Sequence, residues 1–193
     1  YMFPAGMALV LVNMLPARPG VFESHPRVPG YYAPSIGLAA TGLLTIFAGL
    51  PMIIMSCLFF FDPEALAVSV TMATTSVGVA LNNYALAWAG GAVSGLIIAY
   101  ATRKYAYLLL GPLAGYVSGA SGFDVYMPWQ MFLVALGAPV VAWAVYEFTF
   151  SRKFDEHKLV PLFIGAGSYG LIMLGLFKSG TPRGGYFGIE EGA

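Results

Sequence analysis

Long apolar runs alternate with short polar segments along the chain. A membrane crossing needs about 20 apolar residues at a rise of about 1.5 Å each, so the runs are divided where charges and turn residues cluster. This division predicts helical runs at about 33–61, 65–102, 105–122, 127–150 and 158–177, a partial helix at 3–15 and a tail at 178–193. The pattern indicates an all-α fold, with about five membrane-crossing helices in a single transmembrane domain over residues 1–193.

Composition supports a membrane environment. Hydrophobic residues make up 59% of the chain and charged residues only 9%, against roughly 25% charged in soluble domains, and the mean hydropathy is +0.76. We therefore expect an integral membrane protein whose first partner is the lipid bilayer. Nine basic and nine acidic residues give no net charge, so nothing points to nucleic acid. The single cysteine, Cys57, lies in an apolar run and is expected to be a small buried hydrophobe.

The 65–102 run is long enough for one helix or for two hairpinned helices, and charge topology favours one crossing. With one crossing, seven of the nine basic residues fall on the same side, as the positive-inside rule predicts. We expect an extended or re-entrant start at about 65–72. The basic loops 16–32, 103–104 and 151–157 are predicted to be cytoplasmic. The seven residues on that side are Arg18, Arg27, Arg103, Lys104, Arg152, Lys153 and Lys158.

The partial helix at 3–15 is too short to cross and lacks the features of a signal peptide. It is similar to the second half of a helix, so either a precursor is cut there or the chain begins upstream of Tyr1.

Polar groups are scarce inside the predicted helices. Glu147 lies four residues before Ser151, where a carboxylate is expected to reach the interface; a proton-relay role is the alternative. Asn82 and Asn83 lie in the middle of a run and must find partners, either on a neighbouring helix or on unwound backbone, unless they bind a solute. His25 and His157 fall in loops, and no cluster of ligands suggests a metal.

Glycines recur at four-residue spacing in two runs. Gly91 and Gly95 form one set, and Gly111, Gly115 and Gly119 form the other. Residues four apart lie on the same helix face, and small residues there let two backbones approach closely. Both sets are therefore expected to be helix-packing faces.

Three consecutive stretches carry a resemblance to a known family. They are "LNNYALAWAGGAVSGLIIAYATRKY", "LLLGPLAGYVSGASGFDVYMPWQMFLVALGAPVVAWAVYEF" and "FDEHKLVPLFIGAGSYGLIMLGLF". In order and spacing they resemble the seventh to tenth helices of the ammonium transporter and Rh family, over about residues 70–177. The resemblance weakens before residue 65. It implies the second half of that family's inverted-repeat fold, and one repeat without the other makes no complete pathway.

The resemblance also assigns a pore position. The family's tenth helix carries a pore histidine, and alignment from Gly175, Leu176 and Phe177 puts Phe163 at that position; the partner histidine falls at about Tyr1. A phenyl ring cannot share a proton. The resemblance therefore favours a retained scaffold that has lost the residue used for conduction.

Two functional classes follow. The first is a non-transporting relative that serves as an accessory or structural subunit of a larger membrane complex, in contact with other membrane subunits or with copies of itself. The second is a channel for ammonia, ammonium or another small neutral solute. An enzyme is not expected, because no nucleophile with a base, carboxylate pair or metal set occurs within reach. No cofactor is implied.

Overall fold

The computed structural model of the chain describes residues 6–7, 9–11, 14, 35–62, 67–70, 77–151 and 160–178. Residues 6–7, 9–11 and 14 are helical. The later elements are α2 (Ile36–Leu58), β1 (Phe59–Asp62), β2 (Ala67–Val70), α3 (Val77–Thr102), α4 (Ala106–Gly119), α5 (Pro128–Ser151), the π-helix η1 (Pro161–Ala166) and α6 (Gly167–Lys178).

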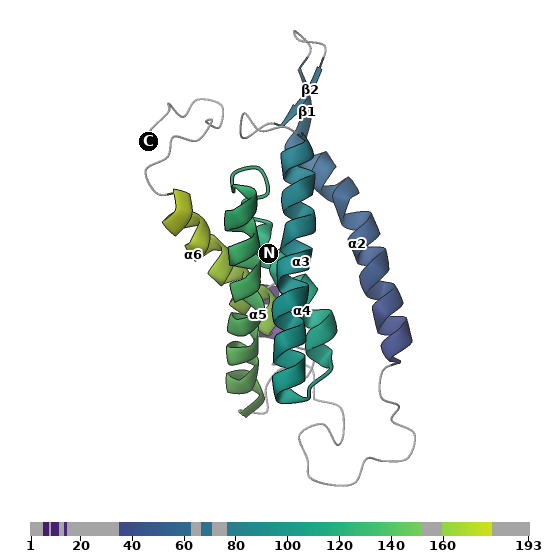
Figure 1. Cartoon of the computed structure of the whole chain (residues 1–193), viewed down its shortest axis with the longest axis vertical. Coiled ribbons are helices and arrows are strands. Elements are labelled where there is room, and N and C mark those ends of the chain that lie inside the picture. The colour runs from purple at the N-terminus through teal and green to yellow at the C-terminus, as the bar shows by residue number, and fades with distance from the viewer. Residues whose placement is uncertain are drawn as a thin grey trace.

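Helices α3, α4 and α5 pack against one another, and η1 and α6 pack on α4 and α5. Helix α2 lies to one side at an angle to this bundle (Figure 1). Small and apolar side chains fill the centre of the bundle, and Ala87, Met131, Val134 and Ala138 are fully buried there. Loops α3–α4 and α4–α5 are short, so these helices run antiparallel to their neighbours.

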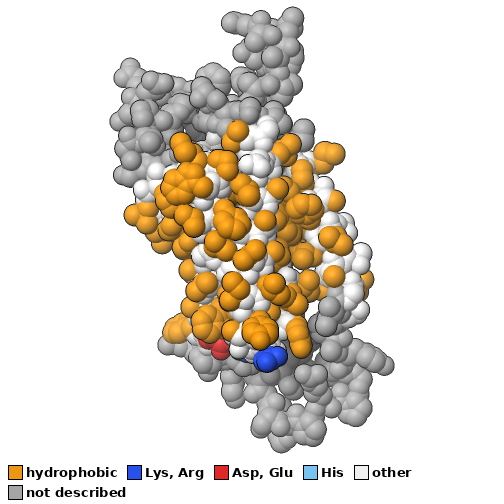
Figure 2. Space-filling view, in the orientation of Figure 1, with side chains coloured by type: hydrophobic (Ala, Val, Ile, Leu, Met, Phe, Trp, Pro, Cys, Tyr) orange, Lys and Arg blue, Asp and Glu red, His pale blue; other side chains and the backbone are white. Residues whose placement is uncertain are grey.

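Three helices are long and apolar enough to cross a membrane, within the part of the chain that the structure describes. Their apolar segments are Gly37–Ile54, Gly78–Thr102 and Pro128–Thr149, and Ala106–Gly119 and Pro161–Phe177 are shorter apolar helices. Figure 2 shows an apolar surface over the bundle, with the visible charged side chains at one end. Such a surface suits lipid contact and would be costly in water.

The end of the expected 33–61 run is not helical. Residues 59–61 belong to β1, which pairs antiparallel with β2 in the register Phe59↔Val70 to Asp62↔Ala67. The helical class is confirmed for the described chain apart from this hairpin, where two short strands replace the expected helix. Three consecutive aromatic residues favour a strand, and a residue that precedes proline, as Asp62 does, disfavours the helical conformation.

The expected 65–102 run holds one continuous helix, α3, which begins only at Val77. The extended start expected at 65–72 coincides with β2 over Ala67–Val70. Helix α4 ends at Gly119, three residues earlier than expected, and a turn with Phe123 and Tyr126 buried leads to α5. The predictions for the loops 16–32 and 152–157, for Tyr1, His25 and His157, and for the tail beyond 178 lie outside the described residues.

Candidate functional site

A glycine seam brings α3 and α4 into close contact in the described chain. A Cβ on Gly91 would lie 2.9 Å from the Cα of Gly115, and one on Gly111 would lie 2.6 Å from the Cα of Gly95. Both distances are well below an ordinary carbon contact of about 3.5–4.0 Å. The two sets of glycines thus face each other, and backbone meets backbone without intervening side chains.

The fifth glycine, Gly119, lies where α3 and α5 meet the end of α4. A Cβ there would lie 2.7 Å from the sulfur of Met131 and 3.0 Å from the Cβ of Ala87. Gly119 of α4 thus contacts both α3 and α5. Substitution there would disturb a flexible methionine first, so the site is more tolerant than the backbone contacts of the seam.

Close approaches at other glycines were not predicted either, and two of them bring a glycine against the backbone of another helix. A Cβ on Gly170 of α6 would lie 2.7 Å from the Cα of Ser118 on α4. A Cβ on Gly90 of α3 would lie 2.9 Å from the carbonyl oxygen of Phe132 on α5. Neither glycine has a partner at four-residue spacing that faces the same helix, so the spacing rule does not detect them. Glycines therefore join α3 to α4, α3 to α5 and α4 to α6.

Asn82 and Asn83 have different environments. Asn83 is completely buried, and its Nδ2 donates to the carbonyl of Phe123 at 2.9 Å and to that of Tyr126 at 2.7 Å. Asn82 is exposed. Asn83 fastens the non-helical turn between α4 and α5 to α3, where backbone polar groups cannot reach water. Among the described residues, its Oδ1 has no hydrogen-bond partner.

The residue at the predicted pore position, Phe163, lies in the π-helix η1. It is partly buried and packs against the main apolar cluster of the bundle. Pro161, at the start of η1, is fully buried and has no N–H to donate. The wider π-helical turn displaces the backbone around Phe163 relative to a regular α-helix, and such turns are frequent at functional sites.

Charged side chains lie near the ends of helices rather than around Phe163. Among the residues whose side chains the structure describes, the charged ones are Arg103, Lys104, Asp124 and Glu147. The first two lie in the α3–α4 loop, Asp124 lies in the α4–α5 turn, and Glu147 lies in the last turns of α5. The described interior around Phe163 therefore offers no carboxylate, histidine, lysine or arginine side chain.

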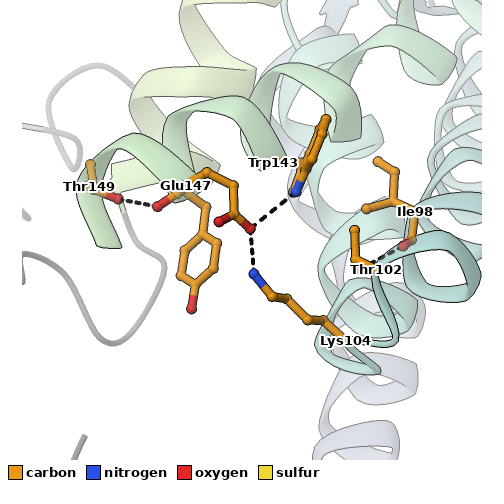
Figure 3. A network of polar contacts seen from close by, with 7 residues as sticks. Ile98, Thr102, Lys104, Trp143, Glu147 and Thr149 are labelled. Carbon is orange, nitrogen blue, oxygen red and sulfur yellow. Dashed lines mark hydrogen bonds and ion pairs between the residues drawn. The ribbon is translucent and has the colours of Figure 1, made fainter. Parts of the chain in front are cut away.

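Lys104 and Glu147 form an ion pair at one end of the bundle. Trp143 Nε1 also donates to Oε1 of Glu147, at 3.2 Å, so the lysine and the indole share one carboxylate oxygen (Figure 3). Both charged side chains are about two-fifths exposed, 43% for Lys104 and 42% for Glu147. The pair joins the α3–α4 loop to the end of α5, so loop 103–104 and the end of α5 lie at the same end of the bundle. This pairing was not predicted from the sequence.

An aromatic cluster attaches α2 to the bundle. Phe47 stacks on Tyr84 at 5.4 Å between ring centroids and meets the edge of Trp88 at 5.1 Å. The hydroxyl of Tyr84 donates to the backbone carbonyl of Phe47 at 2.5 Å. Tyr116 and Phe123 complete the cluster. α2 is thus held to the bundle mainly by aromatic contacts, whereas α3 and α4 are held together by glycines.

No family model matches the chain, and neither a curated protein nor a solved structure matches it. Within the described residues, no group of three or more His, Cys, Asp or Glu side chains is placed to hold a metal ion.

Proposed function

We propose that this protein is a non-transporting membrane subunit, related to the ammonium transporters, that acts as a structural or accessory component of a larger membrane complex. The observation that carries the proposal is the interior of the bundle. Phe163 packs against an apolar cluster, and the charged residues whose side chains are described lie near helix ends. A conducting path for a polar solute needs polar or ionisable groups along its length, since a lumen lined by apolar side chains tends to dewet and close.

The glycine seam supports a scaffold role. Close backbone contacts at Gly91, Gly95, Gly111 and Gly115 leave α3 and α4 little room to slide or separate, because a packed interface has few alternative arrangements. A transporter that alternates between states needs a movable contact between its helices. A rigid seam suits a component that holds a fixed shape within an assembly.

The second candidate is a channel for ammonia or another small neutral solute. The π-helix around Phe163 favours it, because π-helical turns frequently mark functional sites. If the protein is such a channel, the Phe163 ring blocks the lumen, and the rest of the solute pathway is still present.

Reconstituted liposomes with an internal pH dye test the two candidates. Ammonia entry alkalinises the lumen, so a structural subunit should give the same rate as protein-free liposomes, both unmodified and as Phe163→His. Phe148→His is the matched control, because Phe148 is 56% exposed on α5 and the same substitution there cannot reach the bundle interior. Rapid alkalinisation with the unmodified protein would overturn the proposal.

Alkalinisation that appears with Phe163→His and not with Phe148→His would instead establish a plugged pathway and support the second candidate. The assembly part of the proposal is tested by the size of the native particle after mild detergent extraction. A particle that contains this chain alone or only copies of it contradicts a role in a complex with other subunits.

A further inference from the structure

Helix α3 carries an exposed apolar stripe that leads to the basic end of the bundle. Val93, Leu96, Ile97 and Tyr100 are 46%, 57%, 62% and 75% exposed, respectively. Their spacing of three and four residues puts them on one helix face. This face is turned away from α4 and α5, since the glycines that contact those helices are buried. The stripe ends at Tyr100, two residues before α3 ends at Thr102.

Arg103 is held over the end of this stripe. Its guanidinium carbon lies 5.4 Å from the centroid of the Tyr100 ring, within range of a cation–π contact. Its backbone is in the left-handed region, with φ 58°, which residues other than glycine rarely adopt. The left-handed turn directly follows α3, and the side chain lies over the exposed face of the helix that precedes it.

The neighbouring cation has a different environment. Lys104 is paired with Glu147 and lies over the ring of Tyr146 on α5, so its charge is neutralised within the bundle. Arg103 has no carboxylate partner among the described residues. Within the described part of the chain, the end of the stripe therefore carries one positive charge that no carboxylate pairs, adjacent to an apolar face.

We propose that Arg103, Tyr100 and the stripe form a binding site for one anionic phospholipid. The guanidinium matches the oxygens of a phosphate, to which arginine donates two parallel hydrogen bonds. The apolar stripe matches an acyl chain that extends from the headgroup into the hydrocarbon core. An exposed tyrosine at the end of a membrane helix lies at headgroup depth, where the phosphate is located. The charge of Arg103 selects anionic over zwitterionic lipid.

Arg103→Gly is the variant that separates lipid binding from folding. Glycine adopts positive φ without strain, so this variant should fold at least as well as the unmodified chain. Lys104→Gln is the matched control, because it removes the same charge from the next residue and leaves Arg103 in place. Tyr100→Leu retains the apolar stripe while removing the aromatic support.

Native mass spectrometry of the full chain in detergent, with added phosphatidylglycerol, measures the affinity for the first bound lipid. We expect Arg103→Gly to weaken it roughly fivefold to tenfold, Tyr100→Leu to weaken it less, and Lys104→Gln to leave most of it. Phosphatidylcholine should bind to the unmodified protein more weakly than phosphatidylglycerol does. The Arg103→Gly variant should bind the two lipids equally.

Three outcomes would overturn the proposal. Equal loss of affinity in Arg103→Gly and Lys104→Gln would mean that only the overall charge of this end attracts lipid. Equal binding of phosphatidylcholine and phosphatidylglycerol to the unmodified protein would show that the site does not select anionic lipid. Displacement of the lipid by millimolar inorganic phosphate would assign the guanidinium to free phosphate rather than to a lipid headgroup.

Discussion

Asn83 on α3 and Tyr126 in the turn after α4 are joined by a 2.7 Å hydrogen bond from the side-chain Nδ2 to the backbone carbonyl. The same nitrogen donates to the carbonyl of Phe123 at 2.9 Å. A single carboxamide therefore serves two backbone carbonyls of a buried, non-helical turn. The two carbonyls lie 40 and 43 residues further along the chain, so this side chain joins segments that are distant in sequence.

Asn83→Ala is expected to destabilise the protein by about 1–3 kcal/mol, because it withdraws the shared donor from buried carbonyls. Asn83→Asp should be worse, since it replaces a donor with an acceptor that faces two other acceptors. Thermal unfolding in detergent gives the order of the variants.

The adjacent, exposed Asn82 supplies the control: Asn82→Ala should lie within about 0.5 kcal/mol of the unmodified protein. A variant at Asn82 that proved as damaging as one at Asn83 would contradict the assignment of the turn contact to Asn83 alone.

Gly115→Ala tests the seam. The new Cβ would lie 2.8 Å from the Cα of Gly91 and 3.0 Å from its nitrogen, so α3 and α4 must move apart at a cost of about 1–3 kcal/mol. Gly115→Leu should be worse still and should prevent folding or assembly.

The control for the seam is Gly175→Ala, on the exposed side of α6. No atom lies within 4 Å of a Cβ placed there, and alanine is a better helix former than glycine by about 1 kcal/mol. The same chemical change should therefore have opposite signs at the two positions. Equal effects would show that α3 and α4 are not in contact through the seam.

Glu147→Gln serves as a second comparison with Gly115→Leu. The carboxylate that it neutralises is paired at a partly exposed site, where ion pairs contribute about 0–1 kcal/mol. We expect the glutamine variant to be much the milder of the two in thermal unfolding. A larger loss at Glu147 would require a functional role for this carboxylate.

The sequence predicted the faces of helices better than their partners. Four-residue spacing placed Gly91 and Gly95 on one face and Gly111 and Gly115 on another, because a common face follows from helix geometry alone. It could not show that these two faces meet, since that depends on the short loop at 103–104. Gly170 and Gly90 were missed because their contacts are single approaches with no repeat. The first strand of the hairpin, β1, was missed because an apolar run can have the same composition in a helix and in a strand.

The topology prediction concerns the basic loops, and the structure places one of them relative to α5. Loop 103–104 lies beside the end of α5 through the Lys104–Glu147 pair, so a membrane-impermeant probe should label cysteines placed at 103 and 152 from the same side. Cysteines in loop 16–32 should report that side too, and the positive-inside rule predicts that it is cytoplasmic. A cysteine at 124, in the turn at the other end of α4, should be labelled from the opposite side. Same-side labelling at 103 and 124 would refute the span assignment.

Phe163→Ala tests whether this ring is a packing residue. Full burial of a phenylalanine contributes roughly 3–5 kcal/mol on truncation to alanine. Phe163 is only partly buried against the main cluster, so we expect about half of that loss and no gain of ammonia entry in liposomes.

Phe148→Ala is the matched control, because Phe148 is 56% exposed and its truncation should cost less than about 1 kcal/mol. A ring that blocks an otherwise continuous lumen behaves differently, because its removal opens a path and costs little packing. A stable Phe163→Ala variant that admits ammonia faster than Phe148→Ala would therefore identify Phe163 as a plug. A destabilised variant without ammonia entry would identify it as part of the packed interior.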